Sequence, residues 1–388
     1  MIAPRQSNPR SPSAKRFRRR LFLGVLLLFL AIGADINLGW ADRSQLSRRE
    51  QSPGTDASAL KRTIVSPTLD APISKGTNLL WCGTLQLAWN EARRLTGGDL
   101  QFQPGNPLVT ALNKHEFTQD SLDESSYVAE AGYVKDNIQA QIRKAVAEKF
   151  HGIFQPRFIP DKALTPHPQD LVAYACLYKN LSFAIPFERL DEALVFGGTQ
   201  VPAFGMGRYK ASLEKVFPQV LILDYQSKDN FVIELRTKSA GDRLILANIQ
   251  PKSTLGDTIK SVSARIAQGR TETAVAGDLL VVPKMKLDLT REYSEIEGQV
   301  LIPKAANVAK DLILMSAVQN TAFEMNEKGV ELKSEAHLSL SCAKQEEPVA
   351  KHAMIFDKPF LILMQRRDAT MPYFALWVDN PEALINWK

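Results

Sequence analysis

The side chains best suited to nucleophilic or metal chemistry in this 388-residue chain are three cysteines and five histidines. Cys82, Cys176 and Cys342 stand far apart, and neither a C-x-x-C nor an H-E-x-x-H spacing indicates a zinc site. A cysteine hydrolase would need a histidine partner and a local signature around the nucleophile, and no such signature flanks any cysteine. The histidines stand among polar residues, where a solvated surface position is the usual outcome: His115, His151, His167, His337 and His352. We therefore expect no enzyme activity, no metal and no cofactor.

Phosphate and nucleic-acid chemistry are also not indicated. The glycine pairs Gly197-Gly198 and Gly205-x-Gly207 lack the strand–turn–helix context of a phosphate-binding loop. The chain has 48 Lys and Arg against 42 Asp and Glu, but seven of these bases and only one acid lie in residues 1–41. The remainder is balanced, so we expect no nucleic-acid partner.

The N-terminal segment has the pattern of an export signal. Residues 15–20 read KRFRRR and run directly into the 14 apolar residues of 21–34. This apolar stretch is shorter than the ~20 residues that span a bilayer and suits the core of a signal peptide. Cleavage after Gly39-Trp40-Ala41 would make 1–41 a removable signal and the protein secreted. The alternative is an uncleaved anchor, and membrane contact would then come only through this segment.

The rest of the chain predicts one α+β domain after a linker. Residues 42–76 are rich in Ser, Pro and charge, which predicts a flexible linker before a domain over 77–388. Four prolines exclude a long helix from 153–168. Helices are predicted at 79–95, 134–150, 254–269 and 305–313. Strands are predicted at 171–178, 219–225, 230–237, 243–249, 278–289, 361–366 and 372–378. Strands without a βαβ rhythm indicate an α+β fold.

Several segments, taken in order, resemble the serpins. Residues 314–329 (LMSAVQNTAFEMNEKG) are similar to the serpin strand that leads into the reactive loop, and 357–360 (DKPF) to the start of the strand after it. Residues 374–381 (FALWVDNP) resemble the family's closing motif. Further likenesses lie in 171–188, 219–235 and 282–298, and weaker ones in 78–98 and 127–152. The resemblance implies a large, mostly antiparallel main sheet with smaller sheets and surrounding helices. This chain has no counterpart of the first serpin helix before Asn78. Its proline-rich segment 153–168 stands where serpins carry the helix that covers the main sheet. We therefore expect a trimmed serpin-like domain without that covering helix.

The resemblance implies a protein that traps serine or cysteine proteases through a metastable loop. Such a loop is cleaved and then inserts into the main sheet, and the inhibitor supplies no catalytic residue. Glu327 and Gly329 match the family's hinge pattern. The hinge segment continues with Val330, Leu332, Ser334 and Ala336. Leu332, with Lys333 and Glu335 beside it, departs from the small residues of inhibitory serpins, which predicts slow insertion. Family spacing places the candidate reactive bond at Ala343-Lys344.

Residues 330–342 alternate between apolar and polar side chains. The even positions are Val330, Leu332, Ser334, Ala336, Leu338, Leu340 and Cys342, and the odd positions are Glu331, Lys333, Glu335, His337, Ser339 and Ser341. A period of two is typical of a strand with one buried face. Thirteen residues in β conformation cover ~43 Å, and 343–357 can return over up to ~50 Å. We therefore expect 330–342 to lie inside the main sheet without cleavage, as in a latent serpin. The alternative is an exposed loop.

The resemblance also assigns a region that controls opening of the sheet. Its positions correspond to Cys82-Gly83-Thr84-Leu85, Tyr174, Gln319 and, in the breach, Ser182 or Phe183. These residues replace the family's polar latch, and we expect them to lack its hydrogen-bond complement. Cys82 and Cys176 would lie under the main sheet, either as free thiols or, given export, as a disulfide.

Two functions remain open from the sequence. The first is an exported, monomeric, non-inhibitory or latent-like serpin-fold protein that binds or scaffolds a protease or other extracellular protein. The second is a working suicide inhibitor of serine or cysteine proteases with its reactive bond near Ala343-Lys344. Incubation with a panel of proteases distinguishes the two.

Overall fold

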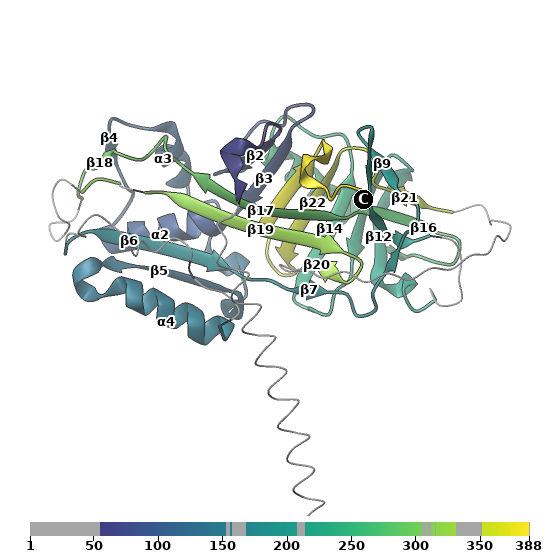
Figure 1. Ribbon diagram of the computed structural model, residues 1–388, viewed down its shortest axis with the longest axis horizontal. Helices are drawn as coiled ribbons and strands as arrows, with labels where there is room; N and C mark the ends of the chain where they lie inside the picture. Colours follow the sequence, from purple (N-terminus) through teal and green to yellow (C-terminus); the bar gives the residue numbers. More distant parts are fainter. Residues whose placement is uncertain are drawn as a thin grey trace, which may run out of the picture.

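The computed structural model describes residues 55–152, 156, 168–207, 214–304, 308, 312–314, 316–330 and 351–387. Figure 1 shows an elongated α+β molecule in which a five-stranded sheet runs lengthwise over a larger sheet. The strands predicted from apolar patterns are confirmed at the positions given below, except that the strand predicted over 278–289 is divided into two strands of different sheets, Leu279–Pro283 and Met285–Glu292.

The largest sheet has eight strands in the order β15-β12-β13-β14-β22-β23-β3-β2. Their bounds are β15 (Glu272–Thr273), β12 (Val220–Ser227), β13 (Asn230–Leu235), β14 (Asp242–Asn248), β22 (Phe360–Arg366), β23 (Pro372–Val378), β3 (Asn78–Cys82) and β2 (Thr63–Ser66). All seven residues of β23 are buried, because this central strand is covered on both faces. Such strands read as continuous apolar runs and not as alternating ones.

The second sheet has five strands in the order β1-β17-β19-β20-β7. They are β1 (Thr55–Asp56), β17 (Met285–Glu292), β19 (Val318–Asn326), β20 (Gly329–Val330) and β7 (Leu181–Ser182). β1 pairs with β17 in parallel, and the other pairs are antiparallel. One face packs on the eight-stranded sheet through side chains such as Leu287, Phe323 and Met325. The outer face carries polar pairs instead, including Lys286 with Glu324 at 3.1 Å.

Smaller elements complete the fold. A four-stranded sheet has the order β21 (Ala353–Ile355), β16 (Leu279–Pro283), β11 (Ala203–Met206) and β8 (Glu188–Arg189). Two-stranded ladders join β9 (Leu194–Phe196) with β10 (Thr199–Val201), and β4 (Phe102–Gln103) with β18 (Val300–Leu301). Two more helices are α3 (Pro107–Leu112) and α5 (Leu255–Gln268). Short 3₁₀ turns are η1 (Ala57–Ala59), η2 (Gln119–Ser121), η3 (Glu124–Ser126), η4 (Val134–Asp136), η6 (Phe217–Gln219) and η7 (Pro381–Ala383).

A separate ladder, β5 (Tyr127–Tyr133) with β6 (Leu171–Leu177), lies between two helices. Leu171 and Ala173 pack in the cluster of α2 (Thr84–Thr96), whereas Val172 and Tyr174 pack in the cluster of α4 (Ile138–Phe150). Because neighbouring residues of a strand point to opposite faces, the two helices cover opposite faces.

The helix α4 covers this separate ladder, whereas the expectation of a missing covering helix concerned the main sheet. The prolines of 153–168 exclude a long helix from that segment alone. The helix α4 is formed upstream of it, by residues whose apolar side chains recur every four positions: Ile138, Ile142, Val146 and Phe150.

Three other sequence expectations need correction. Residues 55–76, assigned to a flexible linker, contribute β1, η1 and β2, because Ala57, Val65 and Leu69 are buried in the main core. The helix predicted over 79–95 is divided, since Asn78–Cys82 is a fully buried strand and the helix begins at Thr84. The helix predicted over 305–313 falls mostly outside the described residues, and Ile313 forms a β-bridge with Val300.

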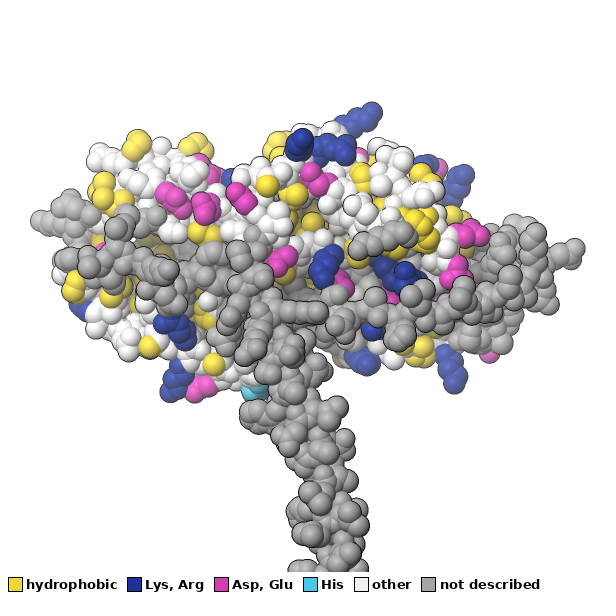
Figure 2. Space-filling view, in the orientation of Figure 1, with side chains coloured by type: hydrophobic (Ala, Val, Ile, Leu, Met, Phe, Trp, Pro, Cys, Tyr) yellow, Lys and Arg dark blue, Asp and Glu magenta, His cyan; other side chains and the backbone are white. Residues whose placement is uncertain are grey.

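Within the described ranges, no helix is long and apolar enough to cross a membrane. The predicted signal, residues 1–41, lies outside these ranges. On the face shown in Figure 2, basic and acidic side chains are interspersed.

Candidate functional site

The candidate site is the point where the chain leaves β19 and reverses direction. β19 ends at Asn326, Glu327 and Lys328 form the turn, and β20 begins at Gly329. Met325 pairs with Val330, and Val330 pairs on its other side with Leu181 of β7. The first two residues after the turn therefore already form a strand between β19 and β7, without cleavage of the chain.

Gly329 is required at this position by both geometry and space. Its φ of +140° lies in a region that L-residues with a side chain rarely adopt. A Cβ on Gly329 would lie 2.5 Å from the carbonyl oxygen of Leu181 and 2.6 Å from Cα of Ser182. The match of Gly329 to the hinge pattern thus has a local structural cause.

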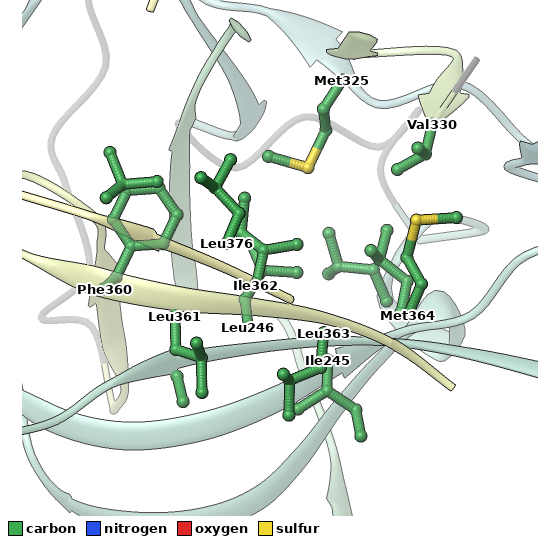
Figure 3. Close-up of a cluster of buried hydrophobic side chains, with 14 of the residues drawn as sticks. Ile245, Leu246, Met325, Val330, Phe360, Leu361, Ile362, Leu363, Met364 and Leu376 are labelled. Atoms are coloured by element: carbon green, nitrogen blue, oxygen red, sulfur yellow. The ribbon is translucent and has the colours of Figure 1, made fainter. Parts of the chain in front are cut away.

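Val330 points into the core and is 1% exposed. Figure 3 shows it beside Met325, above side chains of the large sheet that include Met364 and Ile362. Since the side chains of a strand alternate, burial of Val330 places even-numbered positions on the inner face where this strand begins. Val330 is the one position of the alternation predicted for 330–342 that lies within the described residues.

The turn is fastened to the neighbouring loop and to β17. The amide groups of Phe183 and Phe187 donate to the carbonyl oxygens of Lys328 and Glu327, each at 2.8 Å. The carboxylate of Glu327 forms an ion pair with Lys284, whose side chain is only 10% exposed. Burial opposes ionisation of Glu327, but the hydrogen bond and charge of Lys284, with the charge of Arg189, outweigh it and hold the pKa of Glu327 below its usual value.

In the described residues, β6 and β19 belong to different sheets and do not pair with each other. β20 is antiparallel to both β19 and β7, so it occupies one strand position between them. β6 leads into β7 through residues 178–180, and among the described strands β6 pairs only with β5. From Val318 to Glu324, β19 pairs on one side only, with β17, within the described residues. α2 packs against β5, β6 and β19, so one helix underlies both sheets.

A buried polar network lies beneath β19. The side-chain amide of Gln319 donates to the carbonyl oxygen of Cys82 and to Oγ1 of Thr84, each at 2.9 Å. Its Oε1 accepts a 2.6 Å hydrogen bond from the hydroxyl of Tyr293. The expectation that this region lacks its hydrogen-bond complement is therefore wrong. Sequence reasoning missed Tyr293, and it assigned Thr84 to the opening region without predicting its hydrogen bond to Gln319.

The other two residues assigned to sheet opening lie elsewhere. Tyr174 faces α4, and Phe183 packs against Phe187 with ring centroids 4.7 Å apart. Cys82 and Cys176 are buried free thiols in different clusters, and Cys176 faces α4 and not the underside of the sheet. Burial raises the pKa of both thiols, that of Cys176 to about 11.

The remaining assigned residues lie outside the described ranges: Leu332, Ser334, Ala336, Cys342, Ala343 and Lys344. In the part of the chain that is described, no group of three or more His, Cys, Asp or Glu side chains could hold a metal ion.

The chain matches no protein-family model, and no curated protein matches it. Among solved structures, similar chains are serpins. A highly specific serpin of the insect Tenebrio molitor is 15% identical, with a TM-score of 0.44 over 79% of this chain and 92% of that one. A serpin from Schistosoma mansoni is 16% identical, with a TM-score of 0.44 over 78% and 96%. Human thyroxine-binding globulin, described in complex with thyroxine, is 14% identical, with a TM-score of 0.41 over 79% and 92%. The architecture of the described residues is α+β.

Proposed function

We propose that this chain is an exported, non-inhibitory serpin-fold protein that binds or scaffolds an extracellular protein. In this proposal the strand begun by β20 continues through 331–342 in the space between β6 and β19. The observation that carries it is the position of Gly329 and Val330, paired on both sides and buried in an uncleaved chain.

The side-chain parity supports the same proposal. If the strand continues in the register that Val330 begins, Lys333 and Glu335 take the outer face. That face of β17 and β19 already carries polar pairs, such as Thr290 with Asn320 at 2.8 Å. Large or charged side chains at odd positions would then be solvated and would not obstruct the strand.

A loop already in the sheet has little strain left to release. Trapping of a protease requires that cleavage allow a large gain in strand pairing and burial. Burial of Leu332, Leu338 and Leu340 contributes about 1.5–3 kcal/mol for each side chain. In the inserted form this gain is present before any protease arrives, so cleavage offers no driving force.

The test is incubation of the purified mature chain with a panel of serine and cysteine proteases. We expect no detergent-stable covalent complex with any of them, and slow cleavage of bonds in 331–350. The melting temperature should be nearly unchanged by any cleavage there. A covalent complex, or fast cleavage near Ala343-Lys344 with a sharp rise in melting temperature, would show an exposed inhibitory loop instead.

A further inference from the structure

The N-terminal segment 55–76, called the strap below, connects the two large sheets at their edges. β1 adds to the five-stranded sheet by pairing Thr55–Asp56 with Leu289 and Thr290 of β17. Seven residues later, β2 adds to the eight-stranded sheet by parallel pairing with β3. The guanidinium of Arg291, at the end of β17, donates to the carbonyl oxygen of Val65 at 3.3 Å.

The strap is held by the end of the chain. The carboxylate of Glu382 accepts hydrogen bonds from the amides of Lys61 and Arg62 at 2.9 and 3.0 Å, and from the hydroxyl of Thr63 at 2.7 Å. Burial opposes ionisation of Glu382, and these three bonds outweigh it, so its pKa is lowered. A single side chain from the C-terminus thus fixes the start of β2.

A second contact reinforces this fastening. The side-chain amide of Asn78 donates to Thr63 at 3.0 Å and to Asn380 at 3.1 Å. Asn380 in turn donates to the carbonyl oxygens of Arg62 at 2.8 Å and Gly76 at 3.1 Å. Both Asn78 and Asn380 are buried.

We propose that the strap is a lock that controls how far β17 and β19 can move away from β6. β17 and β19 are joined over eight residue pairs, Met285–Glu292 with Val318–Met325, and therefore move as one ladder. Any strand that enters or leaves the space beside β19 requires this ladder to shift over the eight-stranded sheet. The strap ties the ladder to that sheet, so its hydrogen bonds must break first. This inference rests on the described position of β20 and not on the course of 331–342, so it can fail independently of the proposed function.

Hydrogen exchange of the full chain at 25 °C tests the lock. In a Glu382→Ala variant, amides of β1, β17, β19 and β20 should exchange at least tenfold faster, while those of β13 and β14 change less than twofold. The Glu192→Ala variant is the matched control, because it makes the same change on an exposed glutamate outside the strap.

Two results would overturn the lock. Faster exchange confined to residues 61–63 and 76–80 would show a purely local clamp, and equally faster exchange in every strand would show global destabilisation. Thr63→Val, which removes only the hydroxyl contacts, should show the same pattern at smaller amplitude. It serves as the test if Glu382→Ala does not fold.

Discussion

Replacement of Val330 by aspartate probes whether the start of the loop belongs to the sheet. The side chain of Val330 is 1% exposed, and its burial contributes about 1.5–3 kcal/mol. An aspartate there must either bury a carboxylate without a partner, which costs several kcal/mol, or release β20 from the sheet. Release is the cheaper route, because it gives up only the valine burial and the short pairings with β19 and β7. We estimate a cost of about 3 kcal/mol, equivalent to an approximately 100-fold rise in the released population.

Limited trypsin digestion measures that population, since Lys333 and Lys344 lie within the following 14 residues. Cleavage between 331 and 350 should accelerate by about two orders of magnitude in Val330→Asp, because native-state cleavage follows the open population. Val195→Asp makes the same chemical change on a side chain that is 55% exposed, and it should digest like the unmodified chain. The reasoning is refuted if Val330→Asp and Val195→Asp are cleaved at the same rate, or if the acceleration in Val330→Asp is matched by a general loss of stability in urea.

The other predictions concern the polar network, the thiols and the hinge ion pair. Gln319→Met keeps the size of the side chain but removes its hydrogen bonds to Tyr293, Thr84 and the carbonyl oxygen of Cys82. The free energy of unfolding in urea should therefore fall by about 2–4 kcal/mol. The control Gln250→Met, at an exposed position, should lower it by less than about 0.5 kcal/mol. Cys82 and Cys176 are buried, and their pKa values are raised. In the native chain at pH 8, at most one thiol should therefore react quickly with a disulfide reagent, whereas all three should react in denaturant. Fast reaction of two thiols in the native chain would contradict the structure. The pKa of Glu327 is lower in the folded chain than the ~4.3 of an unfolded one, so its ionised form adds stability above that value and this stability is lost as the pH falls through the folded pKa. Glu327→Gln should therefore lower the free energy of unfolding at pH 7 and approach the unmodified chain as the pH falls through the folded pKa, whereas a difference that stays constant on acidification would exclude the ion pair as the cause.

Local patterns gave most of the strands, because burial on one or both faces leaves a direct trace in the order of residues. The apolar runs of β14, β22 and β23 and the alternation of β17 were sufficient to locate those strands. The strap was missed because it is polar overall. Its few buried side chains include Ala57 and Val65, and the start of β2 is held by Glu382, more than 300 positions later, a separation at which no local pattern reveals contacts.

The hydrogen-bond network was missed for a related reason. Gln319 has a role only in relation to Tyr293 and Thr84, which lie 26 and 235 positions away. A resemblance assigns positions one at a time, so it shows that a residue typical of the family has been replaced at a given position. It does not show that the replacing residue has found a new hydrogen-bond partner elsewhere in the chain. For this reason the sequence led to the wrong expectation that the sheet-opening region lacks its hydrogen bonds.

The start of β20 also changes how the unusual loop sequence should be judged. Measured against the small residues of inhibitory serpins, Leu332, Lys333 and Glu335 argue that insertion is slow. That argument assumes that each side chain must pass into a packed space. The burial of Val330 and the polar outer face of β17 and β19 set two different environments for neighbouring positions, so the relevant property is the face that a residue occupies and not its size. A sequence selected for rapid insertion after cleavage favours small side chains on both faces, whereas one selected to remain inserted favours apolar side chains on one face and solvated ones on the other. The sequence of 330–342 has the second pattern, and its first residue, Val330, is buried between β19 and β7.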